Sequence, residues 1–305
     1  MLYNKRGELT TTQIVTLIVL IASFVIILFL LFRLNLGGTT DVQLCHNSIV
    51  QRGSAVTANI VPLNCKTHYI CISANNECED SRMPNPDDVV TVKSEDEMYH
   101  ALAEEMADCW WMYGEGKVDY LGEADVQEEL YCSVCSSVIF DKSVLAELGV
   151  TNLNQDTFNL YLTSNNISQG KTYAEYFYNQ EIPEGTSITI INPDTNQPYS
   201  PFSFDLGKAF YIVTARSGKG TLLEITVTAV VGAIAVVAIT LAIVGTGGTI
   251  LIPITAGLVG VGIGGAGGHA IGTFIESEGN KILIPMLIPQ ENFKNVPCED
   301  VKSLS

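Results

Sequence analysis

One uncharged stretch, from Ile225 to Ile275, constrains this chain more than any other feature. It holds 51 residues without an Asp, Glu, Lys or Arg, and 12 of them are glycine. About 20 apolar residues already span the hydrocarbon core of a bilayer. A glycine-rich break at 245–248 divides the stretch into two lengths that each suit such a span. We therefore predict a glycine-rich transmembrane helical hairpin over residues 222–275.

Glycines line one face of the second predicted helix of this hairpin. They recur at every fourth position: Gly260, Gly264, Gly268 and Gly272. Such a face lets helix backbones approach closely in lipid. We expect it either to pack against another helix of the same chain or to join copies of the chain into a homo-oligomer.

A second apolar run, from Ile14 to Phe32, predicts an amino-terminal transmembrane anchor over residues 14–33. Its 19 residues carry no charge, and no small-residue cleavage site follows them, so we expect the helix to be retained. Lys5 and Arg6 precede the run and only Arg33 follows it. The excess of positive charge before the run predicts a cytoplasmic amino terminus.

The residues before this anchor carry a resemblance to a known signal. Lys5-Arg6-Gly7-Glu8 ahead of an apolar helix resembles the class III signal of type IV pilins, and the anchor is similar to those of archaeal membrane-anchored surface proteins. The pilin resemblance implies cleavage after Gly7 and packing of the helix into a filament. A polar spacer at 8–13 departs from that pattern, so a plain signal anchor is the alternative.

These segments together predict a multi-pass protein of the cell membrane. A cytoplasmic tail (1–13) and the anchor are followed by an external domain (34–221). The hairpin then returns the carboxyl tail (276–305) to the outside. The lipid bilayer is the first expected partner.

All eight cysteines fall on the predicted external side. They are Cys45, Cys65, Cys71, Cys78, Cys109, Cys132, Cys135 and Cys298. An even number of cysteines outside the cell predicts structural disulfides. We expect at least one bridge within the compact unit of residues 65–78, with Cys45 as a partner from outside it. Cys109 is the natural partner for Cys132 or Cys135, and the rest of the connectivity stays open.

The external region has an α+β pattern. Ser94 and Glu97 form a capping-box pattern ahead of an amphipathic helix that is expected to end at Gly114. The neighbours Trp110 and Trp111 are expected to face different surfaces. Further helices are predicted at 42–50, 125–140, 141–148, 158–162 and 173–178. Strands are predicted at 68–73, 186–192 and 208–215, the last two as an antiparallel pair. The apolar segment 282–288 is too short to span a membrane, so we expect it to lie on the membrane surface or dock on the external region.

Two motifs could carry chemistry but favour other interpretations. Cys132-Ser133-Val134-Cys135 is a CxxC motif, yet Glu128 and Glu129 precede it and disfavour a reactive thiolate. A zinc site at His100, Cys109, Cys132 and Cys135 is the metal alternative to disulfides. The GxGxxG match at 262–267 lies in a stretch so rich in glycine that chance explains it. No catalytic or cofactor-binding residue is predicted.

Charge and composition narrow the partners. The formal net charge of −17 argues against nucleic acid, because phosphate binding needs clustered Lys and Arg. Asn166-Ile167-Ser168 is a sequon, which makes Asn166 a glycosylation candidate. We expect a structural or interaction protein of the cell envelope that contacts an external protein or surface. The alternatives are a pore-forming or fusion protein that assembles through the hairpin and, third, an envelope enzyme.

Overall fold

The computed structural model describes part of the chain. In α1 the described side chains are those of 12–25, and between 237 and 277 the description is of the backbone alone. The described residues are 11–33, 41–54, 61–121, 130–168, 170–179, 181–182, 191–192, 197–198, 203–217, 237–238, 241–245, 248–252, 259–265, 268–277, 280–294 and 298–300.

The chain divides into two units. The first, Met1–Asp41, contains the helix α1 (Thr11–Arg33), as the apolar run predicts. The large apolar side chains described in α1 are exposed, from Ile14 at 43% to Leu20 at 61%. Within the described residues, no helix combines the length and apolarity needed to cross a membrane. In α1 the described side chains cover 12–25 alone, which is shorter than the roughly 20 residues of a membrane span.

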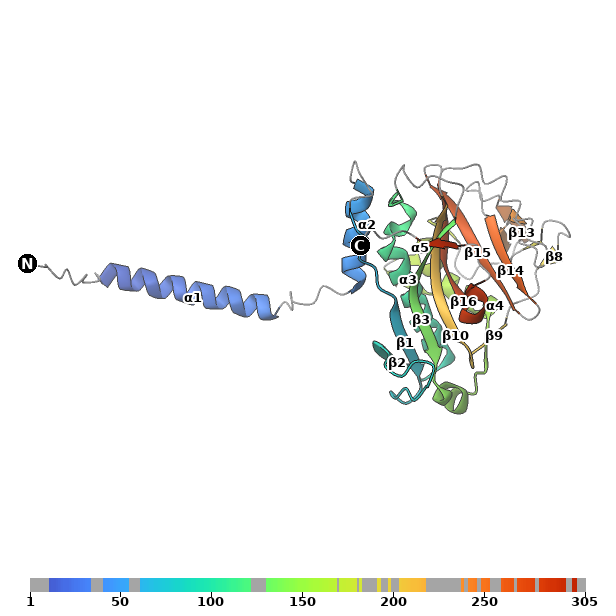
Figure 1. The fold of residues 1–305 in the computed structure, drawn as a ribbon, viewed down its shortest axis with the longest axis horizontal. Helices are drawn as coiled ribbons and strands as arrows, with labels where there is room; N and C mark the ends of the chain where they lie inside the picture. The colour runs from blue at the N-terminus through green and yellow to red at the C-terminus, as the bar shows by residue number, and fades with distance from the viewer. Residues whose placement is uncertain are drawn as a thin grey trace, which may run out of the picture. The chain divides into compact units, whose positions relative to one another are not determined.

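The described part of the second unit, Val42–Ser305, is built on one mixed sheet of nine strands. Its strands run in the order β11-β14-β15-β16-β10-β3-β1-β2, and Figure 1 labels those from β14 to β2. The strand β17 also pairs with β3. The pairs that β1 makes with β2 and β3, and that β17 makes with β3, are parallel; the others are antiparallel. The strands are β1 (His68–Ser73), β2 (Asp88–Thr91), β3 (Leu130–Phe140), β10 (Ala209–Ser217), β11 (Val237–Ala238), β14 (Val259–Gly265), β15 (Gly268–Ser277), β16 (Asn280–Pro289) and β17 (Cys298–Asp300).

Helices cover one face of this sheet. The central helix α3 packs against β3, β10 and β16, and α4 and α5 pack against α3. Apolar side chains from both layers form the main core, including Leu102, Trp110, Val138 and Ile212. The remaining elements are α2 (Asp41–Ser54), α3 (Glu95–Met112), η2 (Gly114–Gly116), η4 (Val144–Leu148), β4 (Asn152–Asn154), α4 (Gln155–Ser164), β5 (Asn166–Ser168), β6 (Lys171–Thr172), α5 (Tyr173–Tyr178), β7 (Ile191–Asn192), β8 (Gln197–Pro198), β9 (Ser203–Asp205), β12 (Leu241–Gly245), β13 (Gly248–Ile252) and α6 (Gln290–Phe293).

The predicted helix and its amino-terminal cap are confirmed, but the capping box is only half formed, because Glu97 Oε2 accepts from the backbone N–H of Lys93 and not from that of Ser94. Ser94 caps the helix by accepting a hydrogen bond from the backbone N–H of Glu97. Gly114, just past the helix end, has a left-handed φ of 75°. Trp110 is buried in the main core, whereas the ring of Trp111 stacks on His46 of α2 with centroids 3.8 Å apart.

The prediction of a helix at 125–140 is wrong, because Leu130–Phe140 forms the strand β3, while 125–129 lie outside the described residues. Apolar residues occur at both odd and even positions of β3, and the strand is therefore buried on both faces. Val138 packs in the main core, whereas Ile139 packs on the opposite face with Cys71. The apolar spacing of four that suggests a helix is therefore also compatible with a fully buried strand.

The carboxyl-terminal segment 282–288 docks on the domain, one of its two predicted places, as part of β16 between β10 and β15. Pro285 lies where the β10–β16 register shifts, between the pairs Val213↔Met286 and Ala215↔Leu283. A proline removes a ladder donor and is tolerated at such irregularities. The Thr214 hydroxyl donates a hydrogen bond to the carbonyl oxygen of Leu283 at 2.7 Å, and this bond connects β10 to β16 where the register shifts.

The predicted antiparallel pairing of 186–192 with 208–215 is wrong for the described residues. β10 does form, but it pairs with β3 and β16. The described end of the first segment, β7, pairs instead with β8. The remaining residues of that segment, 186–190, lie outside the described residues.

The prediction of a transmembrane helical hairpin at 222–275 is wrong wherever the structure describes the backbone. The glycine-rich break falls between two paired strands, with Gly245 opposite Gly248. The proposed helix face of Gly260, Gly264, Gly268 and Gly272 is split between β14 and β15, where Gly264 pairs with His269 and Gly272 with Val261. Valine, isoleucine and threonine favour strands, so composition fits this outcome. The segments 222–236, 239–240, 246–247, 253–258 and 266–267 lie outside the described residues.

Candidate functional site

Four disulfides engage all eight cysteines. Cys71 pairs with Cys78, which confirms a bridge within the compact unit of residues 65–78. Cys45 pairs with Cys65, which confirms Cys45 as a partner from outside that unit. The partner of Cys109 is Cys135.

The two cysteines of the CxxC motif therefore have different partners. Cys132 pairs with Cys298, which joins β3 to β17, and Cys135 joins β3 to α3. Cys135 lies where the β3–β10 register shifts between Ile212 and Val213, and its side chain belongs to the main core. Both sulfurs are engaged, so the arrangement is structural.

The zinc alternative does not fit these bridges. All three of its cysteines are oxidised in disulfides, and zinc requires thiolates. His100, the fourth proposed ligand, lies on α3 with its Nδ1 3.2 Å from the Tyr173 hydroxyl. Among the described residues, no group of three or more His, Cys, Asp or Glu side chains could hold a metal ion.

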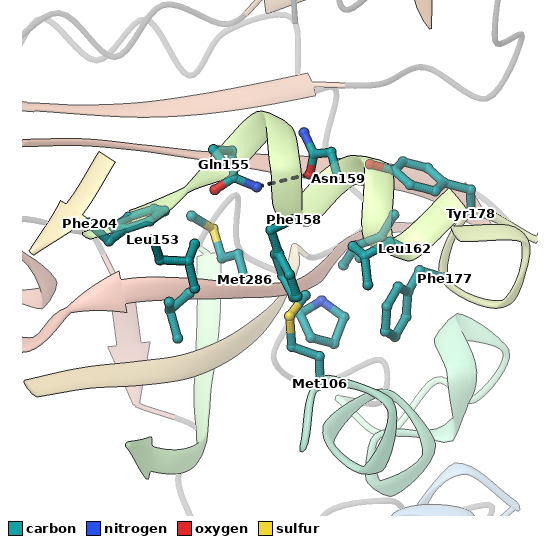
Figure 2. A pocket seen from close by; sticks show the side chains of 13 residues that line it. Met106, Leu153, Gln155, Phe158, Asn159, Leu162, Phe177, Tyr178, Phe204 and Met286 are labelled. Carbon is teal, nitrogen blue, oxygen red and sulfur yellow. Dashed lines mark hydrogen bonds between the residues drawn. The ribbon is translucent and has the colours of Figure 1, made fainter. Parts of the chain in front are cut away.

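A cavity lies between α4 and the sheet (Figure 2). It measures about 60 Å³. Its wall combines aromatic, aliphatic and methionine side chains from α3, α4, α5, β4, β9 and β16. The lining residues are Met106, Leu153, Gln155, Phe158, Asn159, Leu162, Phe177, Tyr178, Phe204, Ile284, Pro285, Met286 and Leu287.

The local sequence explains why α4 stands over this cavity. The Asn154 side chain caps α4 by accepting hydrogen bonds from the backbone N–H groups of Asp156 and Thr157. Phe158 and Leu162 are four residues apart, so they lie on one face of the helix and point into the cavity (Figure 2). Leu153 pairs with Phe204 where β4 meets β9, and both side chains are buried. The helix and the small sheet thus close two sides of the same space.

Two carboxamides form the polar part of the wall. The Gln155 side chain donates a hydrogen bond to Asn159 Oδ1 at 2.9 Å, one turn further along α4 (Figure 2). A carboxamide carries both donors and an acceptor. This wall can therefore position a neutral polar group beside an apolar one. The sequence alone does not predict the cavity, because its walls come from segments up to about 180 residues apart. The apolar pair Phe158 and Leu162 is its one local signal.

A second cluster of polar side chains surrounds His68 at the start of β1. Its Nε2 lies 3.0 Å from Asp88 Oδ2 on β2, and its Nδ1 lies 3.7 Å from Glu105 Oε2 on α3. The Ser136 hydroxyl of β3 donates a hydrogen bond to the same Glu105 oxygen at 3.0 Å. Four elements therefore meet in one small electrostatic network.

Protonation determines what this network can do. Interaction with the Glu105 carboxylate, helped by Asp88 and opposed by partial burial, raises the pKa of His68 to about 9. The imidazole is therefore positively charged at neutral pH and cannot act as a general base there. The Ser136 hydroxyl is directed at a carboxylate. The network fits a structural ion cluster better than a nucleophile and its base.

Two tyrosine–carboxylate pairs connect α5 to α3 and to η2. The Tyr173 hydroxyl donates a hydrogen bond to Glu104, and the Tyr176 hydroxyl donates one to Glu115 Oε1 at 2.9 Å. Burial raises the pKa of both tyrosines, and the carboxylates raise it further. These phenols stay neutral and act as hydrogen-bond donors.

The glycosylation candidate Asn166 lies in β5, which pairs with β6, and its side chain is exposed.

Comparisons with protein-family models, curated proteins and solved structures find no match to this chain.

Proposed function

We propose that this chain is a membrane-anchored protein of the cell envelope, with a disulfide-bonded external domain that acts through contacts with partners or surfaces. The single observation that carries the proposal is the complete pairing of eight cysteines within one unit, from Cys45 to Cys298. Structural disulfides persist in oxidising compartments and are rare in the cytosol.

The amino-terminal helix supports the anchoring part of the proposal. α1 lies in a unit separate from the disulfide-bonded one, and its apolar side chains are exposed where they are described. Lys5 and Arg6 before the helix favour a cytoplasmic amino terminus. Because β16 and β17 belong to the same sheet as β3, we propose one membrane span rather than three.

The alternative of a pore or fusion protein depended on a helical hairpin. The described backbone of that stretch forms strands, so no structural observation favours this alternative.

The proposal is tested in the native cell by determining whether the chain is integral to the membrane and on which side of the membrane its cysteines lie. Membranes are extracted with alkaline carbonate, and intact cells are treated with a thiol reagent that cannot cross membranes, before and after mild reduction. We expect the full chain to stay in the carbonate-resistant fraction and its cysteines to be labelled from outside only after reduction. Release by carbonate, or cysteines labelled only after lysis without reduction, would contradict the proposal.

A further inference from the structure

We propose that the cavity between α4 and the sheet binds the branched aliphatic end of a small uncharged ligand whose head is an amide or hydroxyl group. This goes beyond the proposed function, which concerns the membrane position of the domain and assigns no ligand. The charge, the size and the polar wall of the cavity each support the proposal.

Among the described residues, no charged side chain lines the cavity. All 13 lining residues are apolar or neutral polar, in a chain whose formal net charge is −17. Moving an ionised group from water into such a space is costly unless a partner charge compensates it. The cavity therefore selects against ligands that place a carboxylate or an ammonium group inside it.

The size of the cavity limits the aliphatic group. At about 60 Å³ it is well above the roughly 10–15 Å³ that one water needs on the same kind of measure. It is also well below the approximately 150 Å³ of an engineered apolar cavity that admits benzene. An isopropyl or isobutyl group fits between these limits. Met106 and Met286 adapt the wall to a branched shape, because methionine is flexible and polarisable.

The Gln155–Asn159 pair supplies the head-group contact. Both carboxamides lie in the wall, and Gln155 is half-buried at the first turn of α4. An amide or hydroxyl head can exchange hydrogen bonds with this pair while its alkyl group points toward Phe158 and Met286 (Figure 2). Ligand pockets commonly combine such an apolar lining with a few placed polar groups.

The methionines allow a direct test on the full chain in lipid nanodiscs. With ¹³C-methyl methionine labelling, Met106 and Met286 report on the cavity, whereas Met83, Met98 and Met112 are buried elsewhere and serve as internal controls. Substitution of each by leucine assigns the signals. We expect isobutyramide to shift the Met106 and Met286 signals saturably and to leave the other three unchanged. Isobutyrate, which has the same shape with a negative charge, should shift none.

Two variants connect the shifts to the cavity. Leu162→Phe fills the space and should abolish the isobutyramide response. Gln155→Leu should weaken isobutyramide binding about fivefold, as expected for one lost hydrogen bond, while xenon still shifts Met106 and Met286. The absence of saturable shifts in the unmodified chain, equal responses to isobutyramide and isobutyrate, or shifts spread over all five buried methionines would overturn the proposal. None of these outcomes bears on the carbonate and labelling tests of membrane position.

Discussion

At the scale of single residues, His68 gives the domain a stability that depends on pH. A folded-state pKa of about 9 lies above the ordinary imidazole value, so the contribution is fully present below about pH 6.5 and is lost as the pH rises through 9. The cluster is partly exposed, so we expect about 1 kcal/mol rather than the full Coulomb energy. Urea unfolding between pH 6.5 and 9.5 should show this loss for the unmodified chain and a flatter profile for His68→Asn.

The neighbouring Asp108 titrates at lower pH than His68, so its effect on stability can be distinguished from that of His68. Desolvation and the carboxylates Glu105 and Glu104 raise its pKa to about 6, below the window used for His68. A raised carboxylate pKa means that stability falls as the pH rises from about 4 to 6. If the free energy of unfolding changes with pH in the same way for the unmodified chain and for His68→Asn above pH 6.5, then the charged His68 is not stabilised by its carboxylates.

Two glycines with nearly the same positive φ allow backbone strain to be distinguished from steric clash. Gly114 and Gly149 have φ values of 75° and 70°, where any other residue is strained. A Cβ on Gly114 would lie 2.5 Å from a Val118 methyl group, whereas a Cβ on Gly149 meets nothing within 4 Å. We expect Gly149→Ala to cost about 1 kcal/mol of unfolding free energy and Gly114→Ala clearly more.

The excess cost of Gly114→Ala should respond to the size of Val118. If the contact causes it, adding Val118→Ala should recover part of the loss in a double-mutant cycle measured by urea denaturation. Full additivity of the two substitutions would rule out the contact as the cause.

At the scale of elements, the shifted register between β10 and β16 at Pro285 is stabilised by the hydroxyl group of Thr214. Thr214 is buried, and its Oγ1 donates to the Leu283 carbonyl. Thr214→Val keeps the shape but leaves this carbonyl without that donor, which we expect to cost about 1–3 kcal/mol. Thr214→Ser keeps the donor and should cost less. Thermal unfolding of the pair compares them, and an equal loss in both would contradict a role for the hydroxyl.

The same element scale shows what sequence could predict. The helix α3 was predictable, because its cap and its amphipathic spacing are local and self-consistent. β3 was not, because a strand buried on both faces has no alternation to separate it from a buried helix. The cavity was not predictable either, since its walls join α4 to β16 only through tertiary packing.

The glycine-rich stretch did contain a strand signal beside the apolar length that suggested helices. Residues 259–264 alternate Val or Ile with glycine, a period of two rather than four. The strand pairs β12–β13 and β14–β15 are each closed by facing glycines, Gly245 with Gly248 and Gly265 with Gly268. Two residues between paired strands are typical of β-hairpins. Apolar length outweighed this pattern in the prediction.

At the scale of the whole molecule, the Cys132–Cys298 disulfide joins the middle of the chain to its carboxyl-terminal region. It spans 166 residues, against 7 for Cys71–Cys78. A bridge that closes a longer loop restricts the unfolded chain more, so its loss costs more stability. β17 also holds to β3 through only three paired residues, which makes the covalent link its main attachment among the described contacts.

We therefore expect the double substitution Cys132→Ser with Cys298→Ser to lower the unfolding free energy by about 2–3 kcal/mol more than Cys71→Ser with Cys78→Ser. Urea denaturation of both variants without reductant measures the difference, and matched m-values would show that the same surface unfolds in each. An equal loss in the two variants would mean that the long loop is already restricted when the chain is unfolded. A smaller loss in the first variant would mean that the carboxyl-terminal strands hold to the sheet without the bridge, and that β16 rather than the disulfide fixes the end of the domain.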